Sequence, residues 1–549
     1  MSDWTLSGGV ERLRGRAVDL AARLAGPAGR SATIAQERAM LRMLGVDGLD
    51  RRGRPLAASL VERYCGSDPG RLARGSILPF VVALLEYDLG ARELALEVAS
   101  GAIDLGLEAE LLDRPERLAA AETEATRLFG AALARFDANR TAAREMRDVL
   151  GQAEEPWLGV AVRADEIGLA AEEAKSLLAS GADVVLVRVP ASWEFAEARR
   201  QFGLETPGLF DFRPRGKDGK RAGRSAGDGR RGRGRLPFPP RQERDPVPAG
   251  SQRGLAALRR GADEGAAERG CYASLMTVAS AFAAPEQAVV AAFERIDLVE
   301  ADPMREIVED NVDPERALAD HAFAHRLHAR AGSRVVMGPG PLALGADLAS
   351  GVPPDAATRA GRALALQALG VELALSDGLT PDRLMLGAVP TWTPRDRNHA
   401  SVLVQAWLRN FVFPHHPLVI EEPRFDAQTR GRDSGLVTAL AGAGAVLVIR
   451  DWAAGSVADS AADLGAAAAA AAALRGALGD GKLHGDAADD AAATVRAAVA
   501  ALEKLDGEGW ESLLGPAGRG DAAERLGQAD VVERAVGPNS SAGLLAALK

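Results

Sequence analysis

The amino-acid sequence predicts an α/β fold built on an eight-stranded parallel barrel, with a helical N-terminal region and a helical C-terminal appendage. Two observations point to this fold: short apolar, β-branched runs recur after Pro156, and Ala-rich helical stretches separate most of them. Eight such units within about 300 residues are the size expected of a (β/α)₈ barrel that carries an insertion. The 549-residue chain is too long for one compact core, so additional parts are expected.

We divide the chain into three parts. Residues 1–150 have apolar residues at three- and four-residue spacing, as between Ala32 and Leu44, and are predicted to be helical. Residues 151–452 are predicted to form the barrel. Residues 453–549 are rich in Ala, Asp and Gly, with helical stretches such as Ala487–Leu505, and carry no recognisable chemistry.

The barrel elements are predicted in chain order from the period of their apolar residues. The strands are Trp157–Val162, Asp183–Val189, Tyr272–Val278, Arg295–Val299, Arg334–Met337, Arg383–Ala388, Pro417–Ile420 and Ala445–Ile449. Helices between them include Ala170–Ala179, Pro314–Ala331, Ala356–Leu375, His399–Phe411 and Ser434–Ala441. This alternation predicts parallel strands joined by crossover helices.

A basic insertion, residues 213–250, separates the second and third strands. Its part from Arg213 to Arg244 is rich in Arg, Gly, Pro and Ser and nearly free of aliphatic residues, so burial cannot offset its ordering entropy. We expect it to be disordered. It could bind RNA or an anionic surface, but the lack of interleaved aromatic residues favours a solvated insert.

Composition excludes several classes of function. A net charge of −10 argues against general nucleic-acid binding, which needs a cationic surface. No apolar stretch is long enough to span a bilayer, and no secretory signal precedes Glu11. Cys65 and Cys271 form no disulfide framework, which fits a reducing cytoplasm. We therefore expect a cytoplasmic protein without a membrane segment.

Polar residues follow nearly every predicted strand, at the end of a barrel where active sites lie. They are Arg163, Asp165, Arg188, Ser192, Ser280, Glu300, Asp302, Arg305, Thr391, Glu421, Glu422, Arg424, Arg450 and Asp451, with the turn MGPGP at Met337–Pro341. Arg, Ser and carboxylate side chains suit a small anionic or zwitterionic ligand. The alternative is charge pairing around a solvated barrel mouth. The MGPGP turn is a weak anion-nest signal, because its prolines lack an N–H.

The six lysines are distributed unusually. Lys217 and Lys220 lie in the insertion, Lys482, Lys504 and Lys549 in the C-terminal part, and Lys175 in a predicted crossover helix. None follows a strand. A barrel that holds pyridoxal phosphate, which needs a lysine for its resting Schiff base, would therefore take that lysine from another chain.

Three histidines, His321, His325 and His328, share one face of the predicted helix Pro314–Ala331. Two histidines at such spacing bind zinc in HExxH motifs, but the glutamate of that motif is missing here. We therefore predict no metal site, and interpret these histidines as part of a surface or partner-facing helix.

Several segments resemble the α subunit of D-lysine 5,6-aminomutase. They are TIAQERAMLRMLGVDGLD, LVERYCGSDPGRLARGSILPFVVALL, VASGAIDL, GADVVLVRVP, PEQAVVAAFERIDLV and, more faintly, FPHHPLVIEEPRF. The resemblance covers roughly Ala32 to Arg450 apart from the insertion. It implies a TIM barrel that binds pyridoxal phosphate at its mouth. It also implies a smaller β subunit that carries adenosylcobalamin and the Schiff-base lysine, in keeping with the lack of a DxHxxG motif here.

The resemblance also implies site residues. Arg188 and Ser280 match phosphate-binding residues of the family, and Ser192 matches a second phosphate-binding hydroxyl within one position. Arg424 lies near a basic residue close to the substrate. Two departures stand out: Arg305 replaces the tyrosine that stacks on the pyridine ring, and GPGPLALG replaces an acidic stretch. An arginine can also stack on an aromatic plane.

Three functions follow as hypotheses. The first is an isomerase subunit for lysine or a related basic amino acid, acting with the β subunit by radical 1,2-amino migration in lysine degradation. The second is a repurposed or non-catalytic barrel that keeps the partner contact, which the changed tyrosine and acidic positions would allow. The third is an unrelated barrel enzyme for a phosphorylated small molecule. A neighbouring gene encoding DxHxxG and an early lysine would favour the first.

Overall fold

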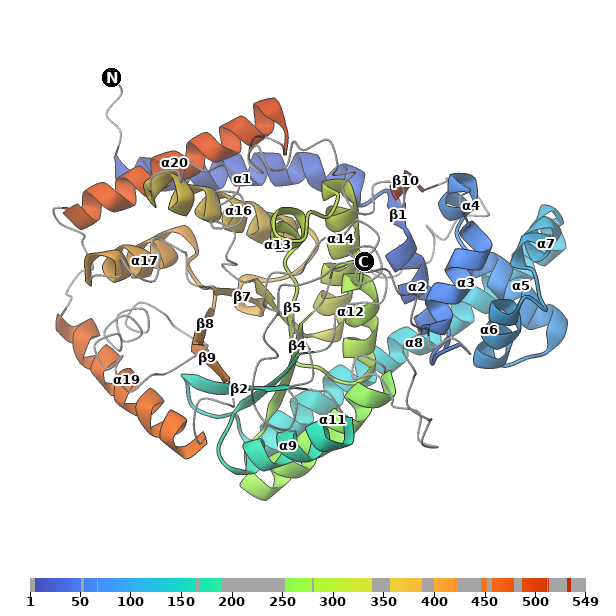
Figure 1. Cartoon of the computed structure of the whole chain (residues 1–549), viewed down its shortest axis with the longest axis horizontal. Helices are drawn as coiled ribbons and strands as arrows, with labels where there is room; N and C mark the ends of the chain where they lie inside the picture. The colour runs from blue at the N-terminus through green and yellow to red at the C-terminus, as the bar shows by residue number, and fades with distance from the viewer. Residues whose placement is uncertain are drawn as a thin grey trace, which may run out of the picture.

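The computed structural model confirms the predicted fold class. Strands β2 to β9 are parallel and form a closed barrel, surrounded by helices (Figure 1). The structure describes residues 5–50, 54–66, 68–163, 167–188, 252–278, 281–337, 356–387, 399–422, 446–451, 457–477, 486–510, 512 and 531–534. Strands pair in chain order, and β2 closes the ring on β9, with Gly159 opposite Ile449. All the C-terminal strand ends therefore lie on one rim.

All eight predicted strands are present. They are β2 Trp157–Arg163, β3 Val184–Arg188, β4 Ser274–Val278, β5 Leu298–Glu300, β6 Arg334–Met337, β7 Leu384–Gly387, β8 Leu418–Glu422 and β9 Val446–Asp451. The largest difference concerns β5, which was predicted to begin at Arg295. Arg295 instead adopts a left-handed φ of 53°, and the Ile296 N–H bonds back to the Ala291 carbonyl. These two residues end the preceding helix, so the strand starts later.

Helices alternate with the strands as predicted. They are α9 Ile167–Ala179, α11 Gln252–Arg269, α12 Ala284–Phe293, α13 Pro303–Val308, α14 Pro314–Ala331, α16 Ala356–Ser376, α17 His399–Val412 and α19 Val457–Ala477, with the 3₁₀ turn η3 Pro381–Arg383. Helix α14 has the predicted bounds, because Asp313 caps the Arg316 N–H at 3.0 Å and Gly332 ends the helix at a φ of 81°. The predicted helix Ser434–Ala441 lies outside the described residues.

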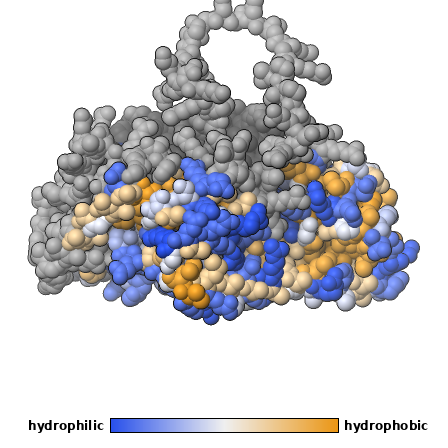
Figure 2. All heavy atoms as spheres, turned by 90° about the horizontal axis from the view of Figure 1, so that it is seen from below, coloured by the Kyte–Doolittle hydropathy of each residue, from blue (hydrophilic) through white to orange (hydrophobic). Residues whose placement is uncertain are grey.

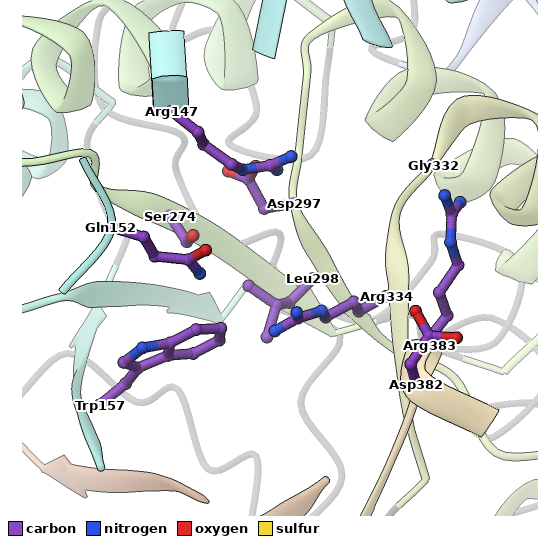
Figure 3. A pocket seen from close by; sticks show the side chains of 10 residues that line it. All are labelled: Arg147, Gln152, Trp157, Ser274, Asp297, Leu298, Gly332, Arg334, Asp382 and Arg383. Carbon is purple, nitrogen blue, oxygen red and sulfur yellow. The ribbon is translucent and has the colours of Figure 1, made fainter. Parts of the chain in front are cut away.

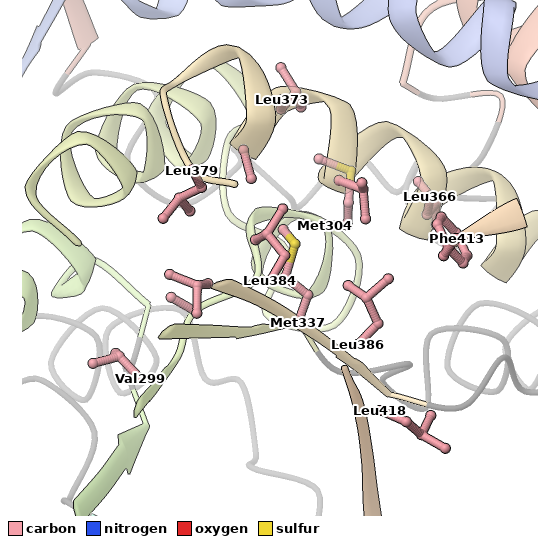
Figure 4. Packing of buried hydrophobic residues seen from close by; sticks show 14 of the residues in the cluster. Val299, Met304, Met337, Leu366, Leu373, Leu379, Leu384, Leu386, Phe413 and Leu418 are labelled. Atoms are coloured by element: carbon pink, nitrogen blue, oxygen red, sulfur yellow. The ribbon is translucent and has the colours of Figure 1, made fainter. Parts of the chain in front are cut away.

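Side chains alternate between the two faces of each barrel strand. In β3, Val184 and Leu186 pack in the barrel interior, whereas Val185 and Val187 pack against the outer helices. Figure 4 shows the outer layer where Leu384 and Leu386 of β7 lie beneath Leu366 and Leu373 of α16. Interior side chains from all eight strands form one buried cluster, so the described part of the barrel interior is filled.

The N-terminal region is helical, as predicted. Its elements are α1 Leu6–Ala28, β1 Ser31–Thr33, α2 Ile34–Met43, α3 Leu56–Cys65, α4 Pro69–Arg74, α5 Ile77–Tyr87, α6 Ala91–Ser100, α7 Leu105–Glu110, η1 Leu111–Asp113 and α8 Pro115–Leu150. Helices α2 to α8 enclose a second apolar core that includes Phe80 and Phe129. Asn139 of α8 joins this core to the barrel by donating to the Ala292 and Phe293 carbonyls at 2.9 and 2.7 Å.

The C-terminal part returns to the start of the chain. Helix α20, Asp486–Glu508, lies beside α1 and α16 (Figure 1). A Cβ at Gly361 would lie 2.4 Å from the Ala497 Cβ, so this close approach of α16 and α20 requires glycine. Strand β10, Val531–Glu533, pairs antiparallel with β1. Helix α20 and strand β10 thus pack against elements from the start of the chain, α1 and β1.

The surface mixes polar and apolar residues. Figure 2 shows hydrophobic patches among hydrophilic residues on one face. Exposed large apolar side chains of the described residues are Val18, Leu85, Tyr87, Leu107, Val149 and Phe411. Within the described ranges, no helix is long and apolar enough to cross a membrane.

Candidate active site at the barrel mouth

Arginine and carboxylate residues end five of the eight barrel strands. These residues are Arg163 of β2, Arg188 of β3, Glu300 of β5, Glu422 of β8 and Asp451 of β9. In the strand register Arg163 is paired with Arg188, and Glu422 with Arg450. The rim therefore brings positive and negative residues from distant parts of the sequence to one end of the barrel, where barrel enzymes bind their ligands.

The structure locates two of the five residues predicted to bind cofactor or substrate. Arg188 is the last residue of β3, although its side chain lies outside what the structure describes. Arg305 is described with its side chain. Ser192, Ser280 and Arg424 lie outside the described residues. The ligand roles of all five stay predictions.

The turn that follows Ser280 is held in place from two sides. Phe282 adopts a φ of 64°, a conformation that is rare for a bulky residue and is found mostly where the surrounding structure enforces it. Arg38 of α2 donates to the Phe282 carbonyl at 2.6 Å. The Arg316 guanidinium of α14 lies 4.7 Å from the Phe282 ring centroid. The start of α12 is thus anchored beside the barrel mouth.

Arg38 is itself fixed by a buried carboxylate. Its Nε donates to Glu286 of α12 at 2.8 Å, and Arg42 donates to the other oxygen of Glu286 at 2.7 Å. Burial would raise the pKa of Glu286, but the charges of Arg38 and Arg42 outweigh it and lower that pKa. Glu286 therefore stays ionised, and the N-terminal helices help to position the β4–α12 turn.

Arg305 is held by two carboxylates. Asp302 begins α13 by accepting from the Met304 and Arg305 N–H groups at 2.9 and 3.4 Å. The Arg305 guanidinium binds Glu300 at the end of β5, and its Nε donates to Glu309 at 3.2 Å. The side chain of Arg305 is only 17% exposed. Its guanidinium plane is therefore fixed near the rim.

The carboxyl groups around Arg305 have raised pKa values. Burial raises the pKa of Glu309 to about 7, against the opposing charge of Arg305. Burial also raises the pKa of Asp302 to about 6, although the hydrogen bonds from the Met304 and Arg305 N–H groups favour its ionised form. Burial alone would lower the pKa of Arg305, but Glu300 and Glu309 outweigh it and raise that pKa. Glu309 and Asp302 can thus gain or lose a proton near neutral pH.

The interpretation of the three histidines as part of a surface helix was wrong. His321, His325 and His328 are at most 1% exposed, because α14 packs between the barrel and the N-terminal helices. The Nδ1 atom of His325 lies 3.2 Å from an Asp377 oxygen. Burial lowers the pKa of His321 to about 4 and that of His328 to about 3, so the row is uncharged at neutral pH.

Glu306 and Glu309 are polar residues of this site that sequence reasoning missed. The Glu306 Oε1 atom lies 3.0 Å from the His321 Nε2 atom, and both side chains are buried. Burial, followed by the nearby charge of Asp320, raises the pKa of Glu306 well above its usual value. A sequence signal did exist for Glu309, since Arg305 and Glu309 have the i,i+4 spacing of a helical ion pair.

Neither of the two described lysines lies on a barrel strand. Lys175 lies on α9, where its Nζ atom is 3.1 and 3.0 Å from oxygens of Glu264 and Glu268 on α11. Lys504 lies on α20. The other four lysines are outside the described residues. Nor do the histidine, cysteine and acidic residues within the described ranges form a group able to hold a metal ion.

The fold and its polar rim define a parallel-barrel protein with a candidate ligand site at the C-terminal ends of the strands. Residues 7–192 and 249–425 match the family model described as the D-lysine 5,6-aminomutase TIM-barrel domain of alpha subunit. The chain belongs to this family. The unmatched stretch between the two ranges contains nearly all of the basic insertion.

Two curated relatives are named lysine 5,6-aminomutase alpha subunit. The protein from Fusobacterium nucleatum is 25% identical over 395 residues, which are 71% of this chain and 66% of the relative. The protein from Acetoanaerobium sticklandii is 24% identical over 417 residues, which are 75% of this chain and 70% of the relative. The alignments thus span about two thirds of each relative, and this chain is a divergent member of the family.

Proposed function

We propose that this chain is the α subunit of a lysine 5,6-aminomutase-like enzyme, an isomerase that moves the terminal amino group of lysine or a related basic amino acid to the adjacent carbon. The observation that carries the proposal is the family match, whose two ranges include strands β2 to β8 and therefore most of the barrel mouth. The names of both curated relatives support it.

The residues at the rim fit pyridoxal phosphate. Arg163 and Arg188 are neighbours in the strand register, and two adjacent arginines suit a phosphate group. Arg188 is the last residue of β3, at the C-terminal rim, which favours a role at the mouth. In this proposal Arg188, Ser192 and Ser280 hold the phosphate. When bound, pyridoxal phosphate supplies a conjugated carbonyl that carries the amino group, and adenosylcobalamin supplies a radical that abstracts hydrogen.

The remaining residues of the site position the reactants. Glu300 and Glu309 hold the Arg305 guanidinium in one plane, so that it can stack on a planar ring in place of the family's tyrosine. Arg38 holds the described turn at Phe282, two residues after Ser280 in the sequence. Arg424 binds the substrate. Fixed positions of this kind lower the entropic part of a barrier and exclude water from a reactive site.

The lysine that anchors the cofactor comes, in this proposal, from a smaller cobalamin-binding β subunit. Neither described lysine lies at the rim, and Lys175 is already paired with two glutamates on the outside of the barrel. The other four lysines belong to the basic insertion and the C-terminal part. A cofactor-binding barrel without its own anchoring lysine is incomplete, which accounts for a partner.

One observation favours the repurposed, non-catalytic barrel as a second candidate. The Arg305 guanidinium, which replaces a tyrosine of the family, is already bound by two acidic residues in this structure. A guanidinium bound in this way can stabilise the barrel mouth without taking part in a reaction. The experiment below distinguishes the two candidates.

The test is reductive labelling. The chain is incubated with pyridoxal phosphate, alone or co-purified with the product of the neighbouring gene, and then treated with borohydride. We expect label on a lysine of the partner only, together with an absorption band of the bound cofactor. Stoichiometric label on any lysine of this chain would refute the subunit assignment. A stable complex that takes up no cofactor would favour the non-catalytic barrel.

A further inference from the structure

A polar cavity of about 160 Å³ lies at the opposite end of the barrel, around the starts of the strands (Figure 3). Its walls come from the last turns of α8, the first residues of β2, β4 and β6, and the turn before β7. The polar residues that matter here are Arg147, Gln152, Ser274, Arg334, Asp382 and Arg383. This cavity is separate from the candidate active site, because the parallel strands place their first and last residues at opposite ends of the barrel.

Arg334 lacks an ionic partner within the part of the chain that the structure describes. Its guanidinium lies over the Trp157 ring, 4.8 Å from the ring centroid, as Figure 3 shows. The indole is itself fixed, since its Nε1 donates to the Ala153 carbonyl at 3.1 Å. The described carboxylates form no ion pair with Arg334. A guanidinium that stacks by its face keeps the N–H groups of its edge for a ligand.

Arg383 also lines the cavity, on the side of Gly332 (Figure 3). Its Nη1 donates to the Ala329 carbonyl at 3.3 Å, and it has no ion pair with a described carboxylate either. Arg147 behaves differently, because its guanidinium binds the Asp297 carboxylate at 2.6 Å. Two arginines of the cavity thus carry positive charge that no described acidic side chain neutralises by contact.

The cavity also contains neutral hydrogen-bonding groups. Ser274 and Gln152 line it, and Figure 3 shows their side chains close to each other on the side of Trp157. A hydroxyl can donate to an anion, and an amide can do the same through its NH₂ group. One water needs roughly 10 to 15 Å³ by this measure of volume, so the cavity has room for an ion of several heavy atoms.

From this arrangement we propose that the N-terminal face of the barrel holds a binding site for a small oxyanion, a free phosphate or a small carboxylate. Arg334 binds the anion, Ser274 supplies a hydrogen bond, and Arg383 adds positive charge at the edge of the cavity. Nothing in the proposed aminomutase reaction uses these residues. The site stands independently of the proposed function and would stabilise the fold when it is occupied.

Acidic groups set an upper limit on the affinity. Asp297 lines the cavity, but Arg147, Arg259 and Tyr272 already bind its oxygens. Asp382 is exposed and has no described ion pair, so its charge opposes an incoming anion. Glu155 attracts the Arg334 guanidinium electrostatically without forming an ion pair with it. We therefore expect binding that is moderate in strength and sensitive to ionic strength.

The test is calorimetric titration of the full chain with inorganic phosphate, and separately with succinate, against sodium chloride of equal ionic strength. Arg334→Met removes the charge and keeps the length of the side chain. The matched control, Arg144→Met, changes an exposed arginine of α8 one turn before Arg147. A separate variant, Arg188→Met, removes the arginine predicted to bind phosphate at the mouth, so that phosphate bound at that end is measured on its own.

We expect Arg334→Met to weaken phosphate binding at least tenfold, because a lost hydrogen bond to a charged group has an effect of that size. Arg334→Lys should weaken it less. Arg144→Met should bind phosphate within twofold of the unchanged chain. The weakening caused by Arg334→Met should be the same in a chain that also carries Arg188→Met, which separates this site from the mouth. If the unchanged chain shows no phosphate or succinate binding beyond the chloride control, or if Arg334→Met binds as tightly as Arg144→Met, the proposal is refuted.

Asp382→Asn gives a test in the opposite direction that does not depend on a weakened fold. Removal of this exposed negative charge should tighten phosphate binding about twofold to fivefold, as expected for a partly screened charge. It should also raise the melting temperature in phosphate but not in chloride. An unchanged affinity would place the bound phosphate elsewhere and overturn the assignment.

Discussion

Two arginines at opposite ends of the barrel, Arg305 and Arg334, have opposite surroundings. At the C-terminal end, Arg305 is bound by Glu300 and Glu309, and carboxyl groups outnumber it. At the N-terminal end, Arg334 and Arg383 line a cavity without an ion pair to any described carboxylate. Sequence composition alone cannot distinguish these cases, because all three arginines lie within a few residues of a strand end.

The comparison shows what an arginine near a barrel strand does in each setting. Where acidic residues surround it, the guanidinium is a fixed structural plane, and the neighbouring acids acquire pKa values near neutrality. Where an aromatic ring supports it, the guanidinium keeps its hydrogen-bonding edge. The first setting suits the positioning of a ligand ring, and the second suits the binding of an anion.

The largest expected effect concerns Asp297, which organises the N-terminal face. Its oxygens accept from Arg147 at 2.6 Å, the Tyr272 hydroxyl at 2.6 Å and Arg259 at 3.1 Å. Asp297→Ala leaves buried Arg259 without this partner, and should lower the free energy of unfolding by about 3 to 5 kcal/mol. Denaturant unfolding measures it. Asp382→Ala, a change at an exposed position, should stay within about 0.5 kcal/mol, and equal losses in both variants would contradict this account.

Arg188→Ala tests the mouth. We expect at least tenfold weaker binding of pyridoxal phosphate by the assembled enzyme, since a charge-assisted hydrogen bond contributes about 1.5 to 3 kcal/mol. Absorbance titration with the partner present measures the dissociation constant. Arg144→Ala on α8 is the control. Unchanged affinity in Arg188→Ala would exclude Arg188 from the cofactor site and weaken the contrast between the two ends.

His328, which is buried on α14, allows a test of the protein interior by the pH dependence of stability. Neither of its ring nitrogens has a hydrogen-bond partner among the described residues. Burial lowers its pKa in the folded chain to about 3, below the usual 6.5. The unfolded chain therefore binds a proton below pH 6.5 that the folded chain does not, and the stability falls as the pH falls from 6.5 towards 3.

His328→Leu removes this dependence. The unchanged chain should lose about 1.4 kcal/mol of unfolding free energy per pH unit below 6.5, and the variant should not. The stability of the variant relative to the unchanged chain should therefore rise by about 2 kcal/mol between pH 8 and pH 5. Denaturant unfolding at both values measures the gain. His415→Asn changes an exposed histidine and should show no such pH dependence. A gain that is independent of pH would mean that His328 is charged in the folded protein or is not buried.

The smallest effect is expected from the basic insertion. Deletion of residues 213–244 should leave the cooperative melting of the barrel unchanged, because this composition offers too few apolar side chains to build a core. Calorimetry of the deletion variant measures it. Loss of the cooperative transition would mean that the insertion contributes to the fold and that neither end of the barrel is complete without it.

Much of the fold could be predicted because the signal is local. The bounds of α14 follow from Asp313, Pro314 and Gly332, each of which acts within its own turn. The count of eight strands follows from β-branched runs between helices. The start of β5 could not be predicted. The run from Arg295 to Val299 has the composition of a strand, but Arg295 takes a left-handed conformation in the structure.

The sequence by itself determined the barrel, the order of its strands, the family and the absence of a lysine after any strand, because each depends on residues close together in the chain. Tertiary structure alone decided the burial of the three histidines, which depends on packing between the barrel and the N-terminal helices. It also decided that Arg334 stacks on Trp157, since 177 residues separate them and only barrel closure brings β2 and β6 around one cavity (334 − 157 = 177). Contacts between such distant residues depend on the whole fold and leave no local pattern in the sequence.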